Sequence, residues 1–125
     1  MTTLTPKARV ALTWLAQVVA AAILGMASLA KLTSAPDAVA LFTLLGVEPW
    51  GRFLLGSVEL LTALLLLWPK SAVVGGGLGV VLMLGAIATH LFRIGITYGG
   101  DASLFLMATI VLLASAATVT LRRGR

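Results

Sequence analysis

Glu59 is the residue whose chemistry most needs an explanation, because it is the only charged side chain in the apolar run GSVELLTALLLLW. A carboxylate facing hydrocarbon costs on the order of several kcal/mol unless a basic or hydrogen-bonding group lies beside it. The candidate partners are Lys31, His90 and Arg93. Such a cluster would offer positive charge, a carboxylate and an imidazole to an oxygen-rich head group. We therefore predict a ligand site formed by Lys31, Glu59, His90 and Arg93.

The composition is that of a membrane protein. Of the 125 residues, 60% are hydrophobic and only 10% are charged, and the mean hydropathy is +1.11. So few charged side chains cannot cover the surface of a soluble domain. The sequence has no Cys, which excludes disulfides, thiol catalysis and thiolate metal sites within this chain. The net charge is +5, but the basic residues stand at the ends of apolar runs, which indicates membrane lipid as the partner and not nucleic acid.

Four apolar runs are long enough to cross a hydrocarbon core of about 30 Å, which takes roughly 17 to 25 helical residues. They cover approximately residues 10–30, 51–68, 73–92 and 102–121. Backbone in lipid must satisfy its own hydrogen bonds, and none of the runs alternates as a barrel strand does. The sequence therefore predicts an all-α fold, an integral membrane four-helix bundle that forms a single domain over residues 1–125.

The segment TSAPDAVALFTLLGVEP, between the first two runs, has helix signals of its own. Ser34 and Pro36 favour the start of a helix, and Gly46 and Pro49 favour its end. Apolar side chains cover most of the surface of this stretch. We therefore expect a short interfacial or re-entrant helix, placed where it could act as a lid.

The distribution of Lys and Arg predicts the orientation in the membrane. On one side lie Lys31, Arg52 and Arg93. On the side of the two termini lie six basic residues, namely Lys7, Arg9, Lys70, Arg122, Arg123 and Arg125. Because basic residues are enriched in cytoplasmic segments, we expect a multi-pass protein of the inner (plasma) membrane with both termini in the cytoplasm.

The predicted helices carry the candidate site residues into the outer half of the membrane. Lys31 ends the first helix, and Glu59 lies eight residues after Gly51, about 12 Å along the second. His90 and Arg93 stand three residues apart near the end of the third helix, so they share one of its faces. The sequence therefore predicts that all four side chains converge.

Small residues on these faces indicate close helix packing. Gly56 and Ala63 lie one turn before and one turn after Glu59, and the third helix begins with the small-residue stretch GGGLG. Small side chains allow the backbones of membrane helices to approach one another closely. Gln17, near the start of the first helix, is expected to form a hydrogen bond across the bundle.

Three short segments resemble the DoxX-like family. They are SLAKL at the end of the first helix, GSVELLTALLLLWP in the second and GAIATHLF in the third. Members are small four-helix bacterial membrane proteins with a Lys, a Glu and often a His or another polar residue at these places. The resemblance covers roughly residues 10–120. One departure is Ser28, where members usually have a Gly three residues before the Lys, which weakens the expectation of close packing there.

The resemblance implies a link to quinone chemistry, because the family takes its name from a subunit of a thiosulfate:quinone oxidoreductase. We therefore expect an accessory subunit that binds a quinone or a lipid-like ligand for a membrane oxidoreductase system. At this site Lys31 and Arg93 would attract the head group, Glu59 would set their charge state, and His90 would donate or accept a hydrogen bond. No other cofactor is expected.

Two other functions stay open. A scaffold or assembly chaperone would bind partner helices laterally, as some distant animal relatives do, and its Lys31–Glu59 pair would only fix the helix register. A small transporter would need a path that also opens to the other side. An independent enzyme is not expected, because the sequence has no nucleotide-binding loop, no pair of His residues for haem and no nucleophile beside a base. A single His argues against a metal site, and the pattern is compatible with a homo-oligomer.

Overall fold

The computed structural model describes residues 5–95 and 102–123, and helices account for most of them. In chain order the helices are α1 (Pro6–Leu32), α2 (Pro36–Leu44), α3 (Trp50–Leu66), α4 (Ala72–Thr89), the π-helical turn η1 (His90–Ile94) and α5 (Ser103–Arg123). No strand occurs within these described ranges, so the all-α prediction is confirmed for them. Arg125, which we counted among the basic residues near the termini, lies outside them.

Within residues 5–95 and 102–123, three helical segments are long and apolar enough to cross a membrane: α1, α4 together with η1, and α5. Each overlaps one of the predicted runs and extends to within a few residues of its expected ends. The helix α3 covers the second predicted run, 51–68, but has only 17 residues, about 25 Å at 1.5 Å per residue, and it is not among these three segments. The chain is thus a helical membrane protein with three candidate spans.

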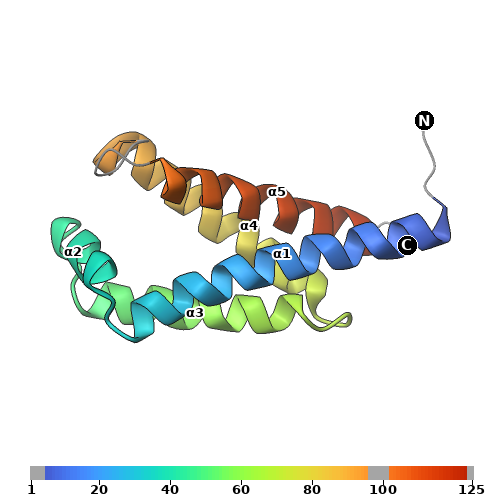
Figure 1. Ribbon diagram of the computed structural model, residues 1–125, viewed down its shortest axis with the longest axis horizontal. Helices are drawn as coiled ribbons and strands as arrows, with labels where there is room; N and C mark the ends of the chain where they lie inside the picture. Colours follow the sequence, from blue (N-terminus) through green and yellow to red (C-terminus); the bar gives the residue numbers. More distant parts are fainter. Residues whose placement is uncertain (1–4, 96–101, 124–125) are drawn as a thin grey trace.

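The long helices form two pairs, α1 with α3 and α4 with α5 (Figure 1). The pairs pack together at one end of the molecule, where α1 begins and α5 ends, and diverge toward the other end, where α2 lies (Figure 1). We call these the terminal end and the α2 end. The buried apolar core includes Leu24 of α1, Leu66 of α3 and Val111 of α5. Packing is therefore closest away from the α2 end.

Glycines of α4 allow the two helix pairs to meet. A Cβ added to Gly75 would lie 2.8 Å from the backbone nitrogen of Leu66 in α3. A Cβ on Gly76 would lie 2.9 Å from the carbonyl oxygen of Ser115 in α5. The predicted small-residue contact is therefore present, and α4 uses it on two sides at once.

Gly75→Ala is expected to lower the free energy of unfolding by about 1–3 kcal/mol, because the new methyl group would overlap backbone atoms of α3 that cannot rotate away. The matched control is Gly77→Ala in the same helix, where an added Cβ has no neighbour within 4 Å. This control should be neutral or stabilising by up to about 1 kcal/mol. Unfolding in detergent by heat would measure both. Equal effects of the two substitutions would contradict the close α3–α4 contact.

The turn between α1 and α2 is a closed helix cap. Ser34 has a φ of +59°. Its amide donates to the carbonyl oxygen of Lys31 at 3.4 Å, and the amide of Ala35 donates to that of Ala30 at 2.9 Å. These two bonds are the Schellman pattern, in which a left-handed residue ends the helix. The short helix predicted in this segment is present as α2, beginning at Pro36.

Candidate functional site

The ion pair predicted between the first and second long helices is formed. The Nζ atom of Lys31, in the last turn of α1, lies 2.9 Å from Oε1 of Glu59, in the middle of α3. Gly56 makes room for this approach, since a Cβ there would lie 3.0 Å from Cβ of Lys31. Exposure differs between the partners, with 15% of the lysine side chain and 5% of the glutamate side chain accessible. The lysine is therefore the more accessible partner.

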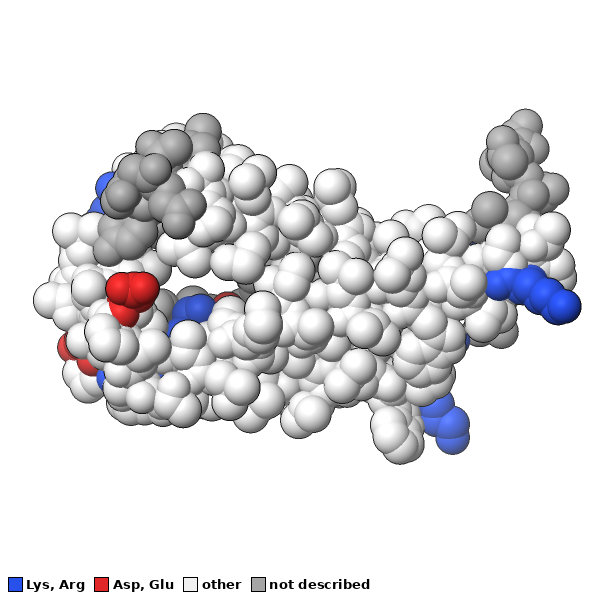
Figure 2. Space-filling view, viewed as in Figure 1, with Lys and Arg blue, Asp and Glu red and all other residues white. Residues whose placement is uncertain are grey.

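The molecule is hollowed at the end where this pair lies. In Figure 2 an opening separates the two helix pairs at the α2 end, and both basic and acidic atoms are visible inside it. Lys31 belongs to the part of α1 that borders this end. Charged groups inside an otherwise apolar opening make it suited to an amphiphilic molecule with a polar head.

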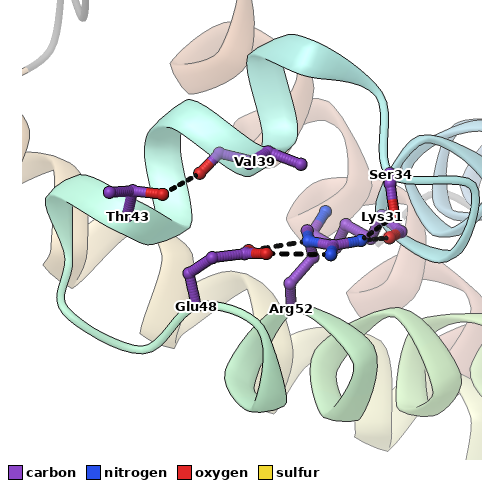
Figure 3. A network of polar contacts seen from close by, with 6 residues as sticks. All are labelled: Lys31, Ser34, Val39, Thr43, Glu48 and Arg52. Atoms are coloured by element: carbon purple, nitrogen blue, oxygen red, sulfur yellow. Dashed lines mark hydrogen bonds and ion pairs between the residues drawn. The ribbon is translucent and has the colours of Figure 1, made fainter.

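Arg52 forms a cluster of bonds that was not predicted. Its Nε and Nη2 donate to the two carboxylate oxygens of Glu48 at 2.7 and 2.9 Å (Figure 3). Its Nη1 donates to the hydroxyl of Ser34 at 2.9 Å and also to the carbonyl oxygen of Lys31. A planar guanidinium can serve all these acceptors at once, which an ammonium group cannot.

The Arg52 cluster, made of Arg52, Glu48, Ser34 and the Lys31 carbonyl, joins three parts of the chain. It ties the start of α3 to the end of α1 and to the loop that follows α2. Only 3% of Arg52 is exposed. From the sequence, this arginine is expected only to contribute to the membrane orientation. The one available signal was its spacing of four residues from Glu48, which on a helix places opposite charges side by side.

The Arg52 cluster makes the stability of the protein depend on pH. The hydrogen bond from Arg52 holds the pKa of Glu48 below its ordinary value. A carboxyl group whose pKa is lowered by folding stabilises the fold above its unfolded pKa, and this contribution is lost as the pH falls through the folded pKa.

We therefore expect Glu48→Gln to be less stable than the wild type at pH 7, with a difference that shrinks progressively as the pH falls below the ordinary value of 4.5. Unfolding measured in detergent between pH 3 and 7 would follow this difference. A difference that stays constant over this range would contradict the assignment. Asp37→Asn, at the start of α2, provides a control of equal charge change.

His90 lies in the opposite helix pair and is buried. Its Nδ1 lies 2.9 Å from the carbonyl oxygen of Ala86, so in the neutral ring this nitrogen carries the proton. The other ring nitrogen, Nε2, is then a hydrogen-bond acceptor, and it is buried with no partner among the described residues. The ring also contacts Phe105 edge to face, at 5.6 Å between centroids.

His90 and Glu59 are at different depths. A Cβ on Gly79 would lie 3.9 Å from Thr62, which places these two residues level with each other. Along α3, Glu59 lies three residues from Thr62 toward the α2 end. Along α4 and into η1, His90 lies eleven residues from Gly79 in the same direction. At 1.5 Å per residue, His90 lies roughly 12 Å farther along the bundle than Glu59. The four candidate residues therefore do not form one contact cluster.

Arg93 is exposed on η1 and has no hydrogen bond or ion pair to the described part of the chain. Of the three candidate partners of Glu59, Lys31 forms the ion pair. Ser28, one turn before Lys31, is fully buried, and its hydroxyl has no partner among the described residues. The departure from the family pattern at this position thus places an unpaired hydroxyl group one helical turn from Lys31.

The predicted bond of Gln17 across the bundle is confirmed at the terminal end. Its Nε2 donates to the carbonyl oxygen of Leu66 at 2.7 Å, and its Oε1 accepts from Nε of Arg122 at 2.6 Å. One buried amide therefore joins α1, α3 and α5. Within the described ranges no group of three His, Asp or Glu side chains is placed to hold a metal ion.

Comparison with known proteins agrees with the motifs around Lys31, Glu59 and His90. Neither a curated protein nor a solved structure matches the chain. The model of the DoxX-like family matches residues 15–119, which include α2, α3 and α4 entirely and most of α1 and α5. The chain therefore belongs to the DoxX-like family.

Proposed function

We propose that this protein is a membrane accessory subunit that binds a quinone or a lipid-like ligand in the opening at the α2 end, for a membrane oxidoreductase system. The observation that carries the proposal is the Lys31–Glu59 pair, two charges placed among apolar helices with the lysine side chain partly accessible. A charge retained inside a membrane protein is a default indication of a functional site.

The chemistry of the pair fits an oxygen-rich head group. The ammonium group of Lys31 has three N–H donors, of which Glu59 takes one, so others remain for a carbonyl or phosphate oxygen. Glu59 keeps the lysine charged and oriented. On the other helix pair, Nε2 of His90 is an acceptor, which suits a hydroxyl of a quinol or of a lipid once the ring becomes accessible. Apolar helix surfaces on either side suit the tail.

The proposed placement has α3 as a fourth membrane span, which gives a four-helix bundle with α2 as the interfacial or re-entrant helix at the outer side. Both termini then lie in the cytoplasm and the protein is in the inner membrane. The pairing of α3 with α1 along its length supports this placement. Trp50 at one end of α3 and Trp68 beyond the other support it too, because tryptophan is enriched at membrane interfaces.

Native mass spectrometry of protein purified in mild detergent tests the proposal. The wild type should carry a specific quinone or lipid that Lys31→Met and Glu59→Gln lose. Lys70→Met removes the same charge from an exposed site and should retain the ligand. Because single variants can lose stability, the double variant Lys31→Met, Glu59→Leu is the stricter test, since it removes both charges together. A folded double variant that keeps the ligand would overturn the proposal.

A scaffold function, which would include contact with a redox protein or with a second copy, is the alternative. It is supported by a shallow groove of about 560 Å³ on the outside of α4 and α5, lined by Gly77, Val80, Ala116, Val119, Thr120 and Arg123. Small residues in such a groove would let another helix approach. Because the chain has no Cys, a Gly77→Cys variant would report a neighbouring helix by crosslinking at one defined site. Solute flux in liposomes would instead favour the transporter function.

A further inference from the structure

A second polar hollow lies at the terminal end, far from the opening beside Lys31. It is a groove of about 260 Å³ between the first turns of α1 and the last turn of α5. We call it the terminal groove, and it is lined by Pro6, Arg9, Val10, Thr13, Trp14 and Arg122. Two arginines and a tryptophan in one small groove is a combination that the function proposed above does not use.

Arg9 has a donor without an acceptor in this groove. Its Nη2 donates to the carbonyl oxygen of Leu121 in α5 at 2.6 Å, which holds the guanidinium in place. Its Nε is buried and has no hydrogen-bond partner among the described residues. A buried N–H group of a charged side chain is costly when it is left unpaired. An acceptor from outside the chain would remove this cost.

Arg122 and Trp14 form the facing wall. Nε of Arg122 donates to Oε1 of Gln17 at 2.6 Å, and its guanidinium lies 5.3 Å from the centroid of the Trp14 ring. Both contacts orient the arginine before any ligand arrives. The groove therefore presents two guanidinium groups in fixed positions, and such groups favour phosphate oxygens because they offer several donors in one plane.

Among the residues that the structure describes, no Asp or Glu side chain lines the terminal groove. The described acidic residues are Asp37 in α2, Glu48 in the loop that follows α2, and Glu59 in the middle of α3. In the view of Figure 2, only basic side chains are coloured at the end where α1 begins. Lys7, Lys70 and Arg123 add to the positive charge there. This excess of positive charge favours an anionic ligand.

We propose that the terminal groove binds the phosphate head group of an anionic phospholipid, held by Arg9 and Arg122, with an acyl chain running along α1. The path for the chain is a stripe of exposed apolar side chains, formed by Val10, Trp14 and Val18, each four residues apart and so on one helix face. This stripe leads from the groove into the apolar part of α1. Its continuity with the groove favours a lipid over free phosphate.

The test compares three additives on the detergent-purified protein: phosphatidylglycerol, phosphatidylcholine and inorganic phosphate. Phosphatidylglycerol should raise the melting temperature and remain bound in native mass spectra, while the other two should do neither at equal concentration. Arg9→Gln should weaken phosphatidylglycerol binding about tenfold or more, because it removes a charge-assisted hydrogen bond. Lys7→Gln removes the same charge outside the groove and should retain nearly full affinity.

Further variants distinguish this site from the one beside Lys31 and allow for a variant that does not fold. Lys31→Met, in the opening at the α2 end, should retain bound phosphatidylglycerol, which separates this site from the proposed function. If Arg9→Gln does not fold, two other measurements replace it. One is phosphatidylglycerol binding by Val10→Asp, which should be weaker than that of the wild type. The other is the preference of the wild type for phosphatidylglycerol over phosphatidylcholine. Equal binding of both lipids, equal binding by Arg9→Gln and the wild type, or the same stabilisation by inorganic phosphate alone would each overturn the proposal.

Discussion

Lys31→Met is expected to lower the free energy of unfolding by about 3–5 kcal/mol, because it leaves the carboxylate of Glu59 buried in α3 without its cationic partner. Only 5% of the glutamate side chain is exposed, so water cannot replace the lost ion pair. Detergent-solubilised protein unfolded by heat or by a stronger detergent would give the difference. Lys70→Met, which removes an exposed lysine, should change stability by less than about 0.5 kcal/mol.

The double variant Lys31→Met, Glu59→Leu should recover most of this loss. Removing both charges together leaves no unpaired group, and a buried ion pair replaced by apolar side chains is often neutral or stabilising. A double-mutant cycle with the two single variants would give the coupling energy directly. Additive losses in the double variant would show that each charge interacts with something other than its partner.

Arg52→Met is expected to cost about 2–4 kcal/mol, because it removes four hydrogen bonds and leaves the carbonyl oxygen of Lys31 with one bond fewer in a buried place. The loss should appear as a lower melting temperature. It should also increase proteolysis of the segment around α2, since the Arg52 cluster ties that segment to α1 and α3. Limited proteolysis followed by mass spectrometry would locate the cleavage.

Two variants control this prediction. Arg93→Met removes an exposed arginine from the same end of the bundle and should be within about 0.5 kcal/mol of the wild type. Arg52→Lys keeps the charge but not the planar fork, so it should recover only a part of the loss. If Arg52→Lys were as stable as the wild type, charge alone, and not the geometry of the bonds, would account for the cluster.

The positions of the helices could be predicted well, because apolar runs separated by Gly, Pro and charge leave few other solutions in a membrane. The predicted runs 51–68 and 73–92 correspond to α3 and to α4 with η1, within a few residues. The pairing of Lys31 with Glu59 could also be predicted, since few charged residues were available in these runs to serve each other.

Whether His90 and Arg93 lie close to that pair could not be predicted from the sequence. Spacing along a helix fixes which face a residue occupies, but it does not fix how far that face stands from the next helix. The two helix pairs diverge toward the α2 end (Figure 1). By the helix rise from the level of Gly79 and Thr62, His90 lies farther toward that end than Glu59. Arg93 is exposed on η1.

The sequence alone determined that this chain is a helical membrane protein in which Glu59 needs a polar partner, because hydropathy and the scarcity of charge are local properties that no packing arrangement changes. The tertiary structure decided which other polar groups meet. It placed Arg52 on the end of α1 and brought Arg9 and Arg122 together in the terminal groove. Residues 21 or 113 positions apart in the chain become neighbours only when the helices have packed, so these contacts depend on helix register and crossing.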